Sequence, residues 1–425
     1  MAERDLDVVV FGATSVTGRR VAGYLAERAE ESDFRWAVGV RDRGRAELVL
    51  GEEGVSAPET IVADVGDSAS LGAMAARTNV VLNLVGPYTL HGRPVIEACV
   101  AAGTHYADLT GEIPFVRRMV AAFDGPAREA GMKLVQVCGF EALPPDLAIQ
   151  LAVEAAAERW DEGLEEVELE VTTTRMPPRP RPSDLISGGT FQSLAAAAGD
   201  PDAAVIADPA CLVDDASAAE AIRARSPITV APRRGIRGAV VAPMSPVAFI
   251  NPAVIHRSAA LRAAETGSRL EPFAYREGMA IPGGAISLPF RYAAAGALAG
   301  MQATAAAGAR ARPSVGRFAS RALSRVLPSS GRGPKRDRLE PWRWRMDLRA
   351  RTAGGHEAVV EIDAEGHPGY LATARMLGEA GLLMAEAGAT PERSGHLTPA
   401  LALGTENIQR FDRARLRFSV DGQAP

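Results

Sequence analysis

Seven residues near the amino terminus could hold a phosphorylated ligand. They read Gly12-Ala13-Thr14-Ser15-Val16-Thr17-Gly18, and they lie between an apolar run and an amphipathic helical pattern. A pyrophosphate requires close backbone N–H groups, a tight turn and the positive end of a helix dipole. Gly12 suits the turn, Gly18 lets the helix pack closely on the strand, and Ser15 replaces the middle glycine of the usual pattern. All seven residues are therefore predicted to contact a dinucleotide.

Two further strand ends predict how the rest of the dinucleotide is recognised. Arg41 follows the expected second strand, where an acidic residue would bind the ribose 2′-OH of NAD and a guanidinium would pair with the 2′-phosphate of NADP. Because Arg41 comes first, NADPH/NADP is the favoured cofactor, while Asp42 leaves NADH open. Asp64-Val65 closes the third strand at the expected height of the adenine ring. There Asp64 either accepts a hydrogen bond from the adenine amino group or caps the next helix near Ser68.

The fourth strand ends in small and conformationally fixed residues, where the nicotinamide half would cross the edge of the sheet. The residues expected to contact it are Leu84, Val85, Gly86 and Pro87. Titratable side chains follow on loops at the same edge, and they are candidates for proton transfer or substrate orientation. These candidates are Tyr88, His91, Asp108 and Glu112. No pair among them has decisive spacing, and a structural cap or ion pair is the alternative for each.

Charge and composition indicate a small-molecule partner. The chain has 425 residues and a formal net charge of -5, and its basic residues are dispersed, so we expect no nucleic-acid partner. The six histidines show no metal-motif spacing, so no metal site is expected. The three cysteines lie outside any CxxC pair and are expected to be buried thiols in a reducing cytoplasm.

The first residues and the middle of the chain bear on localisation. The charged start lacks the apolar core of a signal peptide, which predicts a cytoplasmic protein. Residues 292–309 contain no charged residue over about a transmembrane length, but their many Ala and Gly residues supply little transfer free energy. We expect a buried or interfacial helix there, and association with a membrane surface stays open.

The elements that must position these residues alternate from residue 6 to about residue 150. Apolar runs predict strands at residues 6–11, 34–40, 60–63, 79–85, 105–109 and 133–138. Helical patterns between them cover residues 16–29, 69–77, 94–102 and 113–130. This alternation predicts an α/β fold with an N-terminal Rossmann domain, a doubly wound parallel sheet.

The alternation of strand and helix patterns ends after Gly139. Residues 164–174 alternate acidic and apolar types, which predicts a strand with one wet face. Further strands are expected at residues 342–350, 357–362 and 414–420, and a helix at residues 371–387. We therefore expect an NADP-binding Rossmann domain over residues 1–155. An α+β domain for substrate binding and oligomerisation, with a homodimer as one option, is expected over residues 156–425.

These motifs resemble those of the saccharopine dehydrogenase-like oxidoreductases, and most closely the actinobacterial trans-acting enoyl reductase family. Besides residues 12–18 and Arg41, the resemblance lies in residues 83–99 (NLVGPYTLHGRPVIEAC), 103–112 (GTHYADLTGE), 138–147 (CGFEALPPDL), 187–194 (SGGTFQSL), 366–382 (GHPGYLATARMLGEAGL) and 396–404 (HLTPALALG). Two departures are Ser15, where the family often has glycine, and residues 141–145, which read EALPP where Asp-Ser-Val-Pro-Ser is commoner.

The resemblance implies an NADPH-dependent domain followed by a β-rich second domain, with a helix at residues 368–388 returning to the first. It also implies reduction in trans of the enoyl double bond of a lipid or polyketide acyl chain, bound to a polyketide synthase or acyl carrier partner. Tyr88, just after the Gly86-Pro87 turn, is then the expected proton donor.

Two other functions stay open. Saccharopine dehydrogenase-type imine reduction of an amino-acid adduct would need guanidinium groups to clamp substrate carboxylates. Arg93, Arg117, Arg276 and Arg291 could serve. A non-catalytic nucleotide-bound module could instead dock on a lipid-synthesis complex or a membrane through residues 292–309. The Ala-rich, weakly charged middle of the chain favours an apolar substrate.

Overall fold

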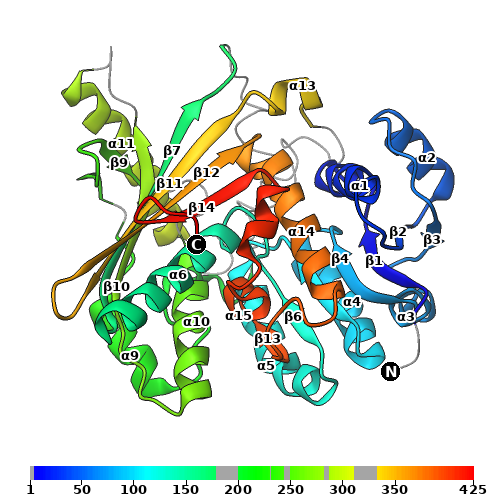
Figure 1. Cartoon of the computed structure of the whole chain (residues 1–425), viewed down its shortest axis with the longest axis horizontal. Helices are drawn as coiled ribbons and strands as arrows, with labels where there is room; N and C mark the ends of the chain where they lie inside the picture. The colour runs from blue at the N-terminus through cyan, green and yellow to red at the C-terminus, as the bar shows by residue number, and fades with distance from the viewer. Residues whose placement is uncertain (1–3, 179–199, 230, 244–248, 282–286, 311–332) are drawn as a thin grey trace.

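The first sheet is parallel and has seven strands (Figure 1). The computed structural model describes residues 4–178, 200–229, 231–243, 249–281, 287–310 and 333–425, so the segment 187–194 lies outside the described residues. In spatial order the strands are β3 (Thr60–Val62), β2 (Trp36–Val40), β1 (Leu6–Phe11), β4 (Thr78–Asn83), β5 (His105–Asp108), β6 (Lys133–Val135) and β13 (Gly395–Leu397). All neighbouring pairs are parallel. The strand order reverses at β1, which confirms the predicted doubly wound α/β fold.

Five helices connect the first six strands. They are α1 (Val16–Ala29), α2 (Arg43–Gly51), α3 (Ser68–Ala76), α4 (Tyr88–Ala102) and α5 (Ile113–Glu129). The amphipathic pattern predicted α1 correctly. The sequence analysis missed α2, whose first turn is Arg43-Gly44-Arg45 and whose N-cap is Asp42. It also began α4 too late, at Pro94, because proline favours the first turn of a helix, whereas here it lies in the second turn.

The second sheet is mixed. Its spatial order is β14 (Leu416–Val420), β12 (Glu357–Glu365), β11 (Arg343–Thr352), β7 (Leu164–Arg175), β10 (Ala274–Ile281), β9 (Val240–Ala242) and β8 (Arg233–Arg234). The alternation predicted for β7 buries Val167, Leu169 and Val171 in the main core, against α6 (Leu143–Trp160) and near α10 (Asn251–Thr266). The expected domain boundary after residue 155 falls inside α6.

The end of the chain contributes to the first sheet. Helix α14 (Thr373–Ala385) packs beside α1 and against β4 (Figure 1). A Cβ atom at Gly378 would lie 2.5 Å from Tyr24 Cδ1, and one at Gly381 would lie 2.9 Å from Leu82 Cδ1, so two glycines allow this close packing. The remaining short elements are η1 (Ala203–Ala207), α9 (Ala216–Arg225), α13 (Arg336–Leu339), η2 (Pro368–Ala372), α15 (Pro399–Leu403) and η3 (Ile408–Asp412).

Helix α11 (Leu288–Arg310) contains the apolar segment 292–309. Its buried side chains include Ala295 and Ala299, and the helix packs on β9 at the edge of the second sheet far from α1 (Figure 1). Most other described side chains on α11 are exposed, so of the two options expected, buried or interfacial, the fully buried helix is excluded. Within the described ranges, no helix is both long and apolar enough to cross a membrane.

Candidate cofactor and active site

The loop between β1 and α1 contains two glycines, Gly12 and Gly18. A larger residue at either position would force neighbouring main-chain atoms to move. Gly12 has a φ of +87°, and a Cβ atom there would lie 2.7 Å from Val85 Cγ2 and 2.9 Å from the Leu84 carbonyl carbon. A Cβ atom at Gly18 would lie 2.3 Å from the Gly12 carbonyl oxygen. The ends of β1 and β4 therefore approach each other through main-chain atoms, as a phosphate-binding turn requires.

Ser15 has a structural role that the sequence analysis did not foresee. It is the N-cap of α1, and its Oγ accepts a hydrogen bond of 2.9 Å from the Gly18 N–H. The first N–H groups of a helix have no acceptor inside the helix, so those of Val16 and Thr17 remain at its positive end. Together with the buried Ala13 and the half-buried Thr14, these residues fit a bound pyrophosphate.

Arg41 lies at the end of β2, where the sequence analysis expected it. Its side chain is 83% exposed, and its Nε lies 3.9 Å from Asp64 Oδ2. The neighbouring Asp42 caps α2 by accepting a hydrogen bond of 3.0 Å from the Arg45 N–H. The Asp42 carboxylate is used in this way, whereas the guanidinium of Arg41 is largely exposed, and its contact with a 2′-phosphate stays a prediction.

Asp64 forms a turn rather than a helix cap. Its Oδ1 accepts a hydrogen bond of 2.8 Å from the Gly66 N–H, whereas Asp67 is the N-cap of α3. The alternative in which Asp64 caps α3 is therefore wrong. The helix begins at Ser68, so its N-cap position falls on Asp67. Val65, beside it, packs on the core beneath α3. Binding of adenine by Asp64 and Val65 stays a prediction.

The end of β4 is held against β1. The Leu84 N–H donates a 2.8 Å hydrogen bond to the Phe11 carbonyl oxygen, and the Val85 N–H donates one of 3.0 Å to Asn83 Oδ1. Gly86 is exposed, and Pro87 is the residue before α4. Leu84 and Val85 thus lie beside Gly12, and Gly86 and Pro87 follow them at the carboxyl edge of the sheet.

Glu112 is fully buried and holds the first turn of α4. Its carboxylate accepts hydrogen bonds from the Tyr88 N–H at 2.9 Å and the Thr89 N–H at 2.7 Å. The Thr89 hydroxyl also donates to it. Glu112 therefore supplies the cap that Pro87 cannot provide, and a catalytic role for it stays a prediction.

Asp108 is the centre of a buried hydrogen-bond network. Its Oδ2 accepts from the Tyr106 hydroxyl at 2.8 Å and from Gln136 Nε2 at 3.0 Å. The network continues from Tyr106 to Asn83 Nδ2, at 2.9 Å, and from Gln136 Oε1 to His396 Nε2, at 3.0 Å. Burial raises the pKa of Asp108 to about 6, despite its hydrogen-bond donors. The network joins β4, β5 and β13 at the edge where the substrate is expected.

Tyr88 lies on the first turn of α4 and is buried. Its hydroxyl donates to the Asn83 carbonyl oxygen at 3.1 Å and accepts from the Leu109 N–H at 3.4 Å. Burial, together with the nearby Asp108 carboxylate, raises the pKa of Tyr88 well above its usual value, so its phenol stays protonated at neutral pH. His91, one turn further along α4, is half-buried.

Sequence reasoning missed Glu141 as a member of this site. Its carboxylate contributes, after burial, Asp108 and Glu112, to the raised pKa of Tyr88, and burial raises the pKa of Glu141 itself. The adjacent Phe140 packs edge-on against Trp344 of β11, with ring centroids 5.0 Å apart, and its N–H donates to Thr373 Oγ1 at 3.0 Å. The loop after β6 thus meets the second sheet here. Residues 141–145 had been noted as a departure from the family, which was the available signal.

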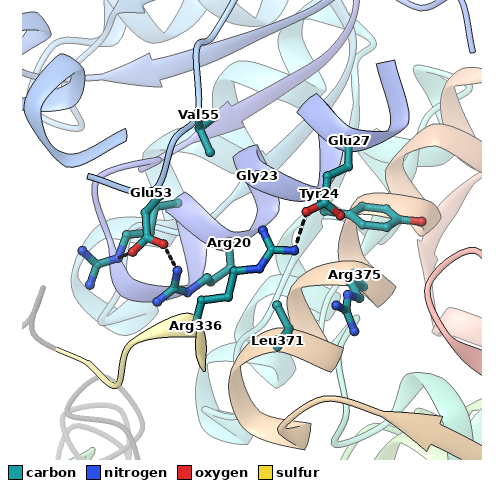
Figure 2. Close-up of a pocket in the computed structure, with 10 residues that line it drawn as sticks. Arg20, Gly23, Tyr24, Glu27, Glu53, Val55, Arg336, Leu371 and Arg375 are labelled. Carbon is teal, nitrogen blue, oxygen red and sulfur yellow. Dashed lines mark hydrogen bonds and ion pairs between the residues drawn. The ribbon is translucent and has the colours of Figure 1, made fainter. Parts of the chain in front are cut away.

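A segment from the second half of the chain crosses the start of α1. A Cβ atom at Gly333 would lie 2.5 Å from Val16 Cγ1, and Arg20 Nη2 donates to the Pro334 carbonyl oxygen at 3.0 Å. Figure 2 shows Arg336, on the same segment, next to Arg20 and paired with Glu27, their side chains lining a recess beside α1. The dinucleotide-binding helix is therefore covered by residues more than 300 positions later.

Comparisons with known proteins agree with this geometry. Residues 8–135 match the saccharopine dehydrogenase NADP binding domain family. The chain is 34% identical over 425 residues to a Mycobacterium tuberculosis protein whose name places it among the trans-acting enoyl reductases, covering 97% of this chain and 96% of that protein. It is 31% identical over 433 residues to the trans-acting enoyl reductase of Mycobacterium ulcerans, covering 99% and 98%. The apo saccharopine dehydrogenase (L-Glu forming) of Saccharomyces cerevisiae aligns with a TM-score of 0.49 and 15% identity, over 98% of this chain and 99% of that chain.

The parallel sheet, the glycine-lined loop and the matched domain define an NADP-dependent oxidoreductase of the saccharopine dehydrogenase type. The predicted cofactor, NADPH/NADP, is thereby confirmed. The near-full-length identity further shows that the chain belongs to the trans-acting enoyl reductase family. In the part of the chain that the structure describes, no group of three or more His, Cys, Asp or Glu side chains is placed to hold a metal ion.

Proposed function

We propose that this protein reduces the enoyl double bond of a lipid or polyketide acyl chain in trans, while the chain is attached to a carrier of a partner synthase. The observation that carries the proposal is the similarity, along nearly the whole chain, to mycobacterial proteins named trans-acting enoyl reductases.

Three of the four guanidinium groups considered for the imine alternative, those of Arg93, Arg276 and Arg291, lie on different elements. Arg93 pairs with Glu97 on α4, with its side chain 59% exposed. Arg276 pairs with Glu166 on the outer face of the second sheet, with its side chain 51% exposed. Arg291 lies on α11. A substrate with several carboxylates requires convergent guanidinium groups, so this arrangement favours acyl reduction over imine reduction.

Bound NADPH supplies the hydride that adds to the β-carbon of the enoyl thioester. The residues of this chain have to exclude water, orient the acyl chain and provide the proton for the α-carbon. We assign that proton to the Tyr88 hydroxyl, because Tyr88 begins α4 directly after the Gly86-Pro87 turn, at the carboxyl edge of the first sheet. Glu141, one of the carboxyl groups whose charge acts on Tyr88, would return a proton to Tyr88 after each turnover and take up another from water.

The test is NADPH oxidation by the purified protein with three substrates: an enoyl chain on an acyl carrier protein, the same chain as a small thioester, and an amino acid mixed with a keto acid. Oxidation with the acyl thioesters, fastest with the carrier-bound chain, is the expected result. Oxidation only with the amino acid and keto acid would replace the proposal by imine reduction. Tight NADPH binding without turnover of any of them would indicate a non-catalytic module.

A further inference from the structure

Arg375, on α14, is a buried arginine without a carboxylate partner among the described residues. It is 3% exposed, and its guanidinium makes one hydrogen bond within the described ranges, from Nη1 to the Glu365 carbonyl oxygen at 3.2 Å. In the recess beside α1, Figure 2 marks ion pairs of Arg20 and Arg336 and none of Arg375. A buried charge is costly unless an opposite charge lies next to it. Arg375 therefore lacks the counter-charge that its burial requires.

The other side chains of the recess do not supply this charge. The charged residues that line it are Arg19, Arg20, Arg336, Arg375, Glu27 and Glu53. Their formal charges, four positive and two negative, leave a net charge of +2. Both glutamates already pair with one of the other three arginines. The recess is thus a basic site on the outer side of the dinucleotide-binding helix.

The guanidinium groups in the recess act on one another. Burial lowers the pKa of Arg375 to about 10, and the charges of Arg415 and Arg336 act in the same direction, against those of Glu27 and Glu340. At neutral pH Arg375 is still charged. In addition, Arg20 Nε is buried and has no acceptor in the part of the chain that the structure describes. The recess therefore holds positive charge and N–H donors in excess of its acceptors.

We propose that this recess binds an oxyanion, which places one oxygen atom against the Arg375 guanidinium. The room between the side chains is about 10 Å³, enough for one water-sized atom, so the remainder of the anion lies outside. Hydrogen bonds from a guanidinium to a charged oxygen are among the strongest in proteins. Arg20, Arg336 and Arg375 come from α1, α13 and α14, so the anion ties the segment that crosses α1 to that helix.

This inference goes beyond the proposed function and does not rest on it, because anion binding can be measured without an acyl substrate. Inorganic phosphate is the probe. The protein is first saturated with NADPH, so that the phosphate-binding loop after β1 is occupied and cannot take up the probe.

The test is thermal unfolding of the full chain with NADPH bound, in increasing concentrations of phosphate, and in chloride at the same ionic strength. We expect phosphate to raise the unfolding midpoint by on the order of 2 °C at ten times its Kd, and chloride to raise it less. Phosphate also stabilises folded proteins without binding to a site, so variants of the recess decide between the two effects.

Arg375→Met should lose most of the response to phosphate, and Arg336→Met should lose part of it. Arg257→Met is the control for the first variant, because Arg257 is also 3% exposed and also donates to carbonyl oxygens. Arg349→Met is the control for the second, because Arg349 is a half-exposed arginine of β11 that pairs with Glu357. Both controls should respond as the wild type does.

An equal response in the wild type and Arg375→Met would overturn the proposal, by showing that phosphate acts on the surface as a whole. An equal rise in chloride, or no rise in phosphate, would also overturn it. NADPH binding at wild-type affinity shows that Arg375→Met is folded. If Arg375→Met does not fold, Arg336→Met decides, because its half-exposed side chain can be shortened without opening the core, and an unchanged response in that variant would overturn the proposal.

Discussion

Glu112 Oε1 accepts a hydrogen bond of 2.9 Å from the main-chain N–H of Tyr88, which ties the loop after β5 to the residue on which the proposed reaction depends. Glu112 thus fixes the position of Tyr88 without contacting the substrate. We therefore expect a variant at Glu112 to lose stability first and a variant at Tyr88 to lose turnover first.

Glu112→Gln should destabilise the fold by about 1–3 kcal/mol, because an amide cannot accept all the hydrogen bonds that the buried carboxylate receives. Denaturant unfolding measures the change in free energy. Glu97→Gln is the control, since Glu97 is a half-exposed residue of α4 whose contact is an ion pair with Arg93. Equal effects in the two variants would contradict the capping role of Glu112.

Gly18→Ala should abolish most NADPH binding. The added Cβ would lie 2.3 Å from the Gly12 carbonyl oxygen, and this main-chain atom cannot move without opening the phosphate loop. Gly72→Ala on α3 is the control, because nothing lies within 4 Å of a Cβ there. Nicotinamide fluorescence titration reports both, and wild-type affinity of Gly18→Ala would place the cofactor elsewhere.

Arg41→Ala should weaken NADPH binding roughly tenfold or more and leave NADH binding nearly unchanged, since a hydrogen bond between charged groups contributes about 1.5–3 kcal/mol. Arg276→Ala removes a half-exposed guanidinium from the second sheet and should change neither affinity. A parallel loss of NADPH and NADH binding by Arg41→Ala would show that Arg41 does not recognise the 2′-phosphate.

Tyr88→Phe should lower kcat about a hundredfold or more, as expected for removal of a general acid, with little change in the Kd for NADPH. The loss of the hydrogen bond to Asn83 costs about 1 kcal/mol of stability, which leaves the variant folded. Tyr292→Phe, at a half-exposed tyrosine of α11, controls for loss of a phenol. Full turnover by Tyr88→Phe combined with inactivity of Glu141→Gln would transfer the role of donor to Glu141.

The burial of His256 predicts that the free energy of unfolding falls as the solution becomes acidic. It is fully buried near Phe273, with ring centroids 5.4 Å apart, and burial lowers its pKa from 6.5 to about 3. Because the unfolded chain binds the proton at a higher pH than the folded chain, stability is lost as the pH falls from 6.5 towards 3. Between pH 7 and pH 5, His256→Leu should lose about 2 kcal/mol less than the wild type.

The half-exposed His356 provides the comparison. His356→Leu should keep the pH dependence of the wild type, measured by denaturant unfolding at each pH. If His256→Leu follows the same curve, the neutral state of the buried ring does not contribute to acid sensitivity.

The first sheet could be predicted because its central strands are buried on both faces and so consist of consecutive apolar residues, as in Val8-Val9-Val10. Strand β13 could not, since Gly395-His396-Leu397 is too short to show a pattern and pairs with residues 133–135. Local sterics made Gly12 and Gly18 predictable. The cap that Glu112 gives to α4 was not, because it joins residues 24 positions apart through folding of the sheet.

The late contributions of β13 and α14 to the first sheet have a consequence for biosynthesis. When a ribosome has produced β6, the first six strands of the dinucleotide-binding half are complete. The surface around Leu82 is not yet covered by α14, and β6 is not yet paired with β13. A nascent chain would carry this open edge and apolar face through the synthesis of about 240 further residues, a state prone to aggregation. We expect this half to need chaperone protection until translation nears its end.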